Sequence, residues 1–170
     1  LLQHIALKMH EEQKGEMQED ELRSFLMGIL AKTIGEKRTV QRATDKFIMI
    51  IRERTGLLIE TEGKYRFSHL VFQEYLAALG ILEREDYQEY ILQRLPEAWW
   101  RETILLAIGQ LSLYSKEKTS KLIQSIANYK PEPVPNHNLE LAMEALRDVG
   151  PTRVYSDVVD EIQTHINRSS

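Results

Sequence analysis

The chain has 170 residues, of which 42% are hydrophobic and 28% charged, and it contains no cysteine. This composition can supply a buried core for one domain or two small ones, and it excludes disulfides and thiolate metal sites. The net charge of −4 opposes a chain-wide affinity for nucleic acid, because phosphate binding comes mostly from lysine and arginine.

One segment departs from this charge balance. Residues 32–66 hold nine basic and five acidic side chains, so their local charge is +4 and the rest of the chain carries −8. No apolar run approaches the roughly 20 residues of a membrane helix, and no targeting segment is recognisable. The sequence therefore predicts a cytoplasmic protein without membrane contact.

The first half of the chain has the element order of a winged helix. Apolar residues at three- and four-residue steps predict helices around residues 2–9, 22–30 and 40–51, and Gly56 ends the third. The spacing then changes to two, which predicts one β-hairpin over residues 57–67 with its turn at 61–64. Three helices followed by a hairpin are typical of this helix-turn-helix variant.

A fourth helix is predicted directly after the hairpin, capped by Ser68 and ending near Gly80. Its buried stripe would consist of apolar residues at helical spacing. The residues of that stripe are Val71, Phe72, Tyr75, Leu76 and Leu79. We expect Phe67, Phe72, Tyr75 and Leu76 to be core residues rather than a ligand pocket, because their spacing already explains them.

The remaining sequence predicts helices throughout. Helical pairs start near Glu97 and Asn138, about 40 residues apart, which is the period of HEAT-type repeats, and a linker with three prolines covers residues 130–138. The predicted fold is mainly α, with a winged-helix domain over residues 1–82 and a HEAT-like region over residues 83–170. Such pairs cannot bury their apolar faces alone, so we expect a fragment of a larger protein.

No catalytic centre is recognisable in the sequence. The nearest approach to a phosphate loop, residues 28–37, lacks the required glycine and lysine spacing and is better explained as a helix end and turn. No histidine pair has metal-ligand spacing, and no serine lies in a nucleophile elbow. We therefore expect no enzyme activity, no metal and no cofactor in this segment by itself.

One phrase resembles a known family. The residues Phe67-x-His69-x-x-Phe72-Gln73-Glu74-Tyr75-x-Ala77-Ala78 closely resemble the end of the winged-helix domain in NACHT-type STAND NTPases, the group that contains the NOD-like receptors and bacterial relatives. Residues 1–9 and 99–106 are similar to the flanking parts of those proteins, so the resemblance covers roughly the first two thirds of the chain. Residues 141–151 resemble a HEAT repeat.

The resemblance implies a P-loop ATPase domain upstream, with ADP or ATP and Mg²⁺ in the parent protein, and a role in signal transduction or defence. It also implies that His69 contacts the β-phosphate of ADP and holds the resting state closed. A histidine at the first turn of a helix suits an anion, since free amides and the helix dipole favour negative charge there. The other interpretation is a histidine that only covers the hairpin edge.

Further contacts follow from the same resemblance. Gln73 and Glu74 either face the upstream ATPase domain or belong to a solvated helix face. The expected partners are that ATPase domain, a protein ligand on the repeat region, and further copies of the protein on activation.

Two alternatives to a nucleotide-coupled regulator remain open. The first is a DNA-binding transcription regulator, because winged helices often place their third helix in the major groove and residues 32–66 are basic. Asp45 and Glu53 interrupt that helix, which counts against DNA as a partner. The second alternative is a plain scaffold without nucleotide coupling.

Overall fold

The computed structural model describes residues 1–130 and 134–169, and it divides into two compact units, Leu1–Ala77 and Ala78–Ser170. Most described residues are helical, which confirms the mainly α prediction. Two prolines of the predicted linker, Pro131 and Pro133, lie outside the described residues.

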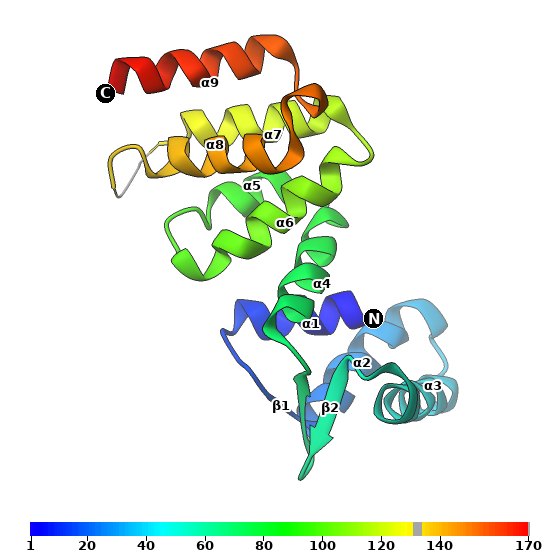
Figure 1. Cartoon of the computed structure of the whole chain (residues 1–170). Helices are drawn as coiled ribbons and strands as arrows, with labels where there is room; N and C mark the ends of the chain where they lie inside the picture. The colour runs from blue at the N-terminus through cyan, green and yellow to red at the C-terminus, as the bar shows by residue number, and fades with distance from the viewer. Residues whose placement is uncertain (131–133, 170) are drawn as a thin grey trace. The chain divides into compact units, whose positions relative to one another are not determined.

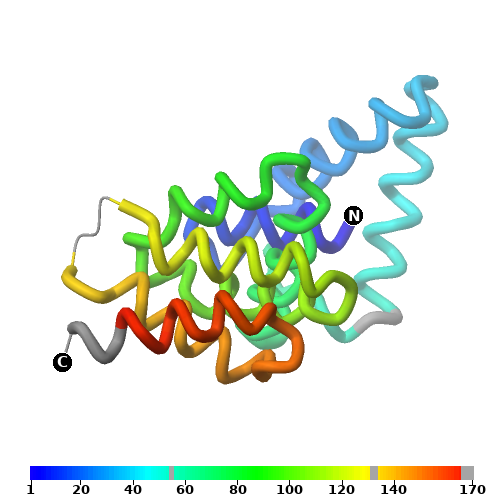
Figure 2. Tube along the Cα trace, turned by 90° about the horizontal axis from the view of Figure 1, so that it is seen from above, coloured from blue at the N-terminus to red at the C-terminus, as the bar shows by residue number. Residues whose placement is uncertain are grey.

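The N-terminal unit is a winged helix with three helices and a small antiparallel sheet (Figure 1). Its elements, with the helix that leads out of it, are α1 (Leu2–Glu11), β1 (Met17–Gln18), α2 (Glu19–Ile34), α3 (Lys37–Ile50), η1 (Ile51–Thr55), β2 (Leu58–Thr61), β3 (Lys64–Phe67) and α4 (Leu70–Leu82). α2 and α3 pack along each other as a helix-turn-helix (Figure 2). The tight connection between them is possible because Gly35 has a positive φ of 76°.

The sheet contains one strand more than the predicted hairpin. β1 pairs with β3, with Met17 opposite Tyr65, so the strand order is β1-β3-β2. A strand of two residues shows no alternation of apolar and polar side chains, which is why the sequence pattern did not reveal it. The Glu19 amide donates to the Gly63 carbonyl at 2.8 Å and continues the link between α2 and the hairpin turn.

The hairpin itself is confirmed, with Glu62 and Gly63 in its turn at φ values of 53° and 75°. Two successive residues with positive φ give the turn geometry that matches the twist of paired strands. Tyr65 and Phe67 are buried on one face, and Leu58 is buried opposite Phe67. The inward-facing residue of β2 is therefore Leu58, while Leu57 and Ile59 fall on the other face.

The third helix ends where the sequence predicted. Val40, Thr44 and Ile48 of α3 are buried, and the helix widens into the π-helical turn η1 before Gly56, which has a left-handed φ of 60°. π-helical turns often mark functional or strained positions. Here the turn directs the chain from α3 into β2.

Two predictions about α4 were wrong. The helix begins at Leu70 and ends at Leu82, and Ser68 does not cap it, because its side-chain oxygen is buried without a hydrogen bond among the described residues. Phe72 and Tyr75, predicted as core, are 37% and 39% exposed. The buried side of the helix carries Gln73, Ala77 and Ala78 instead, because small residues and an amide, rather than the large apolar ones, face the interior.

The C-terminal unit is a stack of helices. Its elements are α5 (Tyr87–Leu92), η2 (Ala98–Trp100), α6 (Arg101–Ser112), α7 (Lys116–Asn128), α8 (His137–Val149), η3 (Pro151–Arg153) and α9 (Ser156–Ser169). α6 packs on α7, α7 on α8, and α8 on α9, and these helices run alongside one another in two views (Figures 1 and 2). Ser115 caps α7 by accepting a hydrogen bond from the Lys118 amide at 3.2 Å.

The core of this unit consists of the predicted apolar stripes. Trp100, Ile104 and Ile108 are buried before and along α6, and Leu141 and Ala145 are buried on α8. Tyr90 of α5 meets Trp100 edge to face at 5.9 Å, and the Arg94 guanidinium lies over the Tyr90 ring. Large residues on α5 and α6 with small ones on α8 let the helices approach closely.

Candidate functional site

An exposed apolar surface lies at the start of α4. We call it the α4 patch and define it as Leu70, Val71, Phe72 and Tyr75, which are between 37% and 53% exposed. Single exposed apolar residues are ordinary, but four within six positions form a contiguous apolar stretch of the helix surface. Such a surface is typical of an interaction site.

His69 borders this patch. It is exposed and directly precedes the first helical residue, so it lies at the amino end of α4 rather than within its first turn as predicted. Its ring meets the Phe72 ring edge to face, with centroids 5.6 Å apart, and its carbonyl accepts from the Phe72 amide at 3.1 Å. The imidazole is thereby held at the surface beside the positive end of the helix dipole.

The two neighbours predicted as interdomain contacts have different environments. Gln73 is 2% exposed, and its side-chain Nε2 donates to the Lys14 carbonyl at 3.4 Å, so it is used inside its own unit. Glu74 is half-buried. The family phrase thus has a buried set, which includes Phe67, Gln73 and Ala77, and an exposed set formed by His69 with the α4 patch.

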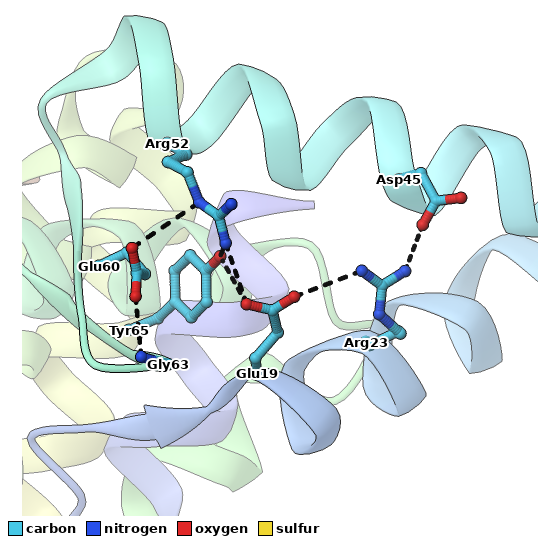
Figure 3. Close-up of polar contacts among 7 residues, drawn as sticks. All are labelled: Glu19, Arg23, Asp45, Arg52, Glu60, Gly63 and Tyr65. Atoms are coloured by element: carbon cyan, nitrogen blue, oxygen red, sulfur yellow. Dashed lines mark hydrogen bonds and ion pairs between the residues drawn. The ribbon is translucent and has the colours of Figure 1, made fainter.

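A second polar cluster joins α2, η1 and the sheet (Figure 3). The Arg52 Nη2 atom donates to the Tyr65 hydroxyl at 2.7 Å and to Glu19 Oε2 at 3.0 Å. The Tyr65 hydroxyl in turn donates to Glu19 at 3.3 Å. Burial raises the pKa of the Tyr65 hydroxyl, and the hydrogen bond to Tyr65 raises the pKa of Arg52.

The cluster continues to both sides. Arg23 of α2 bonds Asp45 of α3 and also reaches Glu19 at 3.4 Å, and the hydrogen bond to Asp45 raises the pKa of Arg23 (Figure 3). On the other side, Glu60 accepts from the Gly63 amide at 2.8 Å and so closes the hairpin turn. This network fixes the wing against the helix-turn-helix, and each of its carboxylates already has a partner within the unit.

Sequence reasoning did not find this network. Glu19 and Tyr65 are 46 positions apart, and Arg52 lies in a turn whose π-helical geometry no local pattern announces. The available signal was the mixed charge of residues 32–66, which does not say which charges pair.

Within the described residues, no three His, Asp or Glu side chains are placed to bind a metal ion together. In the same part of the chain, no helix combines the length and the apolar character that a bilayer crossing needs. The groups that can meet a ligand at the α4 patch are therefore one imidazole, four apolar side chains and the amino end of a helix.

Residues 1–81 match the family model described as a winged helix-turn-helix domain C-terminal to NACHT. The match begins at the first residue and ends within α4, one residue before its last. The chain shows no significant match to a curated protein or to a solved structure. A domain of this family is not itself catalytic. The N-terminal part of this chain thus belongs to the family of winged helix-turn-helix domains that lie C-terminal to NACHT.

Proposed function

We propose that this chain is a regulatory and scaffold segment of a NACHT-type signal-transduction NTPase. In this proposal the winged helix holds an ADP-bound ATPase domain of the same protein in a closed state, and the helices after it link that domain to a sensor region. The observation that carries the proposal is the exposure of His69 beside the α4 patch, within a domain whose family is defined by its place after NACHT.

His69 supplies the nucleotide contact. An imidazole N–H at the amino end of a helix can donate to a phosphate oxygen, and a hydrogen bond to a charged group contributes about 1.5–3 kcal/mol. The ring has no competing role in the interior of its unit, since its residue is exposed and its ring contact is with exposed Phe72. ADP, when bound to the ATPase domain, would supply the anion that this donor meets.

The α4 patch supplies the interdomain contact. Burying its four apolar side chains against another domain stabilises the closed state, because each square ångström of apolar surface removed from water contributes about 25 cal/mol. Glu74 lies beside the patch at the edge of such an interface. Gln73 contributes indirectly, because its buried amide anchors α4 to the loop after α1.

The C-terminal unit is the scaffold in this proposal. The hairpins α6–α7 and α8–α9 start 36 residues apart, near the period of HEAT-type arrays, and each helix packs on the next. Repeat surfaces of this kind bind protein ligands, so a ligand on these helices would shift the balance between closed and open states. Opening would release ADP and permit assembly of several copies.

The test uses the full-length protein with its ATPase domain. His69→Ala removes the donor but leaves an exposed position that the core does not need. We expect ADP to dissociate about tenfold faster or more, because each 1.4 kcal/mol changes a two-state balance tenfold. The measurements are the ADP off-rate with a fluorescent analogue and the oligomeric state without a trigger.

His4→Ala is the matched control, since His4 is an exposed histidine on α1 of the same unit. A regulatory role predicts faster release for His69→Ala alone, together with a higher oligomer fraction at rest. Equal ADP retention in both variants and the wild type would show that His69 covers the hairpin edge and has no nucleotide role.

A further inference from the structure

A second surface of the winged helix is basic. Arg38, Arg42 and Lys46 follow one another at four-residue steps on α3, and all three are exposed. We call these three residues the α3 stripe. Residues four apart lie on the same side of a helix, and the eight-residue separation of its ends corresponds to about 12 Å.

The stripe is not neutralised by its own unit. Among the described residues, no acidic side chain lies within ion-pair distance of Arg38, Arg42 or Lys46. Lys37, also exposed at the start of α3, is in the same situation. A row of cations without counter-charges raises the local positive potential.

The acidic residues nearby do not offset this row. Asp45 is turned toward Arg23 of α2, so its charge is met by a residue outside the stripe (Figure 3). Glu36 precedes the helix and accepts a hydrogen bond from Thr39 at 2.6 Å. Glu53 lies beyond α3, in η1. The premise that Asp45 interrupts the basic face, drawn from sequence alone, therefore fails in the folded unit.

The opposite side of α3 fixes the stripe in place. Val40, Thr44 and Ile48 are buried against the unit, and the Thr44 hydroxyl donates to the Val40 carbonyl at 2.9 Å. The helix is thus anchored along the length over which the cations are displayed. On the wing, Arg66 is exposed on β3 and likewise has no ion-pair partner among the described residues.

We propose that the α3 stripe, assisted by Arg66, is a binding surface for the phosphate backbone of a nucleic-acid duplex. The second helix of a helix-turn-helix is the element that enters the major groove, and a helix fits a groove about 12 Å wide. Each strand offers a phosphate about every 3.4 Å along the axis, so a rigid row of cations meets several at once. This surface is separate in sequence from His69 and does not depend on the proposed nucleotide role.

The contact is electrostatic and independent of base sequence. Proteins that bind DNA in this way have dissociation constants of about 10⁻⁴–10⁻⁶ M at physiological salt. The logarithm of the affinity falls linearly with the logarithm of salt concentration, with a slope of about −0.9 for each phosphate neutralised. Removing three contacts should therefore reduce the slope by about 2.7.

The experiment is a fluorescence-anisotropy titration of a labelled 24-base-pair duplex of arbitrary sequence with the chain of residues 1–170, between 50 and 200 mM salt. The test variant is Arg38→Gln/Arg42→Gln/Lys46→Gln. The control variant, Lys118→Gln/Lys121→Gln/Arg147→Gln, removes the same charge from exposed positions of the C-terminal unit. Circular dichroism melting checks that both variants keep the wild-type fold.

We expect the control to match the wild type at 50 mM salt and the test variant to bind far more weakly. A slope change of 2.7 corresponds to about 40-fold in the affinity ratio between the two salt concentrations. Asp45→Asn, which removes the only acidic residue between Lys37 and Lys46, should strengthen binding severalfold.

Three results would overturn the proposal. These are equal losses in the test and control variants, no binding by the wild type at 50 mM salt, or a preference of the wild type for vesicles with anionic lipid over the duplex at equal charge. The last result would reassign the stripe to a membrane surface.

Discussion

Helix α8 and the first two turns of α4 have similar sequence patterns but different environments. On α8 the apolar residues Leu141, Ala142 and Ala145 are buried, as their spacing predicts. On α4 the same spacing marks Phe72 and Tyr75, which are exposed, while the polar Gln73 is buried. Periodicity identifies the apolar side of a helix, but it does not say whether the chain supplies what covers that side.

The neighbours of each helix explain the difference. α8 packs against α6, α7 and α9, so its apolar side is enclosed by helices of its own unit. The start of α4 instead faces its unit through small residues and an amide, and it leaves the α4 patch at the surface. In the function proposed above, the cover for this patch comes from the ATPase domain.

Leu141→Ala tests the enclosed side of the comparison and should have the largest effect. Deleting a buried leucine side chain costs about 2–5 kcal/mol, because apolar transfer energy is lost and a cavity remains. Both tryptophans of the chain, Trp99 and Trp100, lie in the C-terminal unit, so tryptophan fluorescence during urea unfolding reports on that unit. An unchanged midpoint would contradict the enclosed position of Leu141.

Gln73→Ala tests the polar residue on the buried side of α4. Removing the side chain leaves the Lys14 carbonyl without this donor, and an unsatisfied buried group costs about 1–3 kcal/mol. We expect lower stability of the N-terminal unit, measured by amide hydrogen exchange in α1 and α4. Glu74→Ala, at the half-buried neighbouring position, is the control and should cost less.

Tyr65→Phe tests the network that holds the wing. The loss of two hydrogen bonds, to Arg52 and Glu19, should cost about 1 kcal/mol near neutral pH. Thermal unfolding followed by circular dichroism measures this change.

The same variant has a predicted pH signature. Burial raises the pKa of Tyr65, so the neutral hydroxyl stabilises the folded state below the unfolded pKa of about 10, and this stability is lost as pH rises through the folded pKa. The wild type should therefore lose stability between about pH 9 and pH 11 more steeply than Tyr65→Phe. Parallel pH profiles would show that the Tyr65 hydroxyl is accessible to water.

Val71→Ala tests the exposed side of the comparison and should have the smallest effect. Val71 is 53% exposed, and surface substitutions usually change stability by less than about 0.5 kcal/mol. The isolated chain should melt at nearly the wild-type temperature. A loss of more than about 1 kcal/mol would mean that the α4 patch is already covered within this chain.

The sequence by itself determined the mainly α class, the order of the winged-helix elements, the hairpin and the helices after Pro96. These features follow from local rules, since helical and strand periodicities, glycine at Gly56 and Gly63, and proline positions act over a few residues. The position of His69 next to a helix start also follows from the phrase that contains it.

Tertiary structure decided what local rules cannot express. The pairing of β1 with β3, the partners of Glu19 and Asp45, and the exposure of Phe72 each depend on residues far away in the chain. The burial of a side chain and the neutralisation of a charge are properties of the surroundings that the whole fold creates, so the α4 patch and the α3 stripe became visible only in three dimensions.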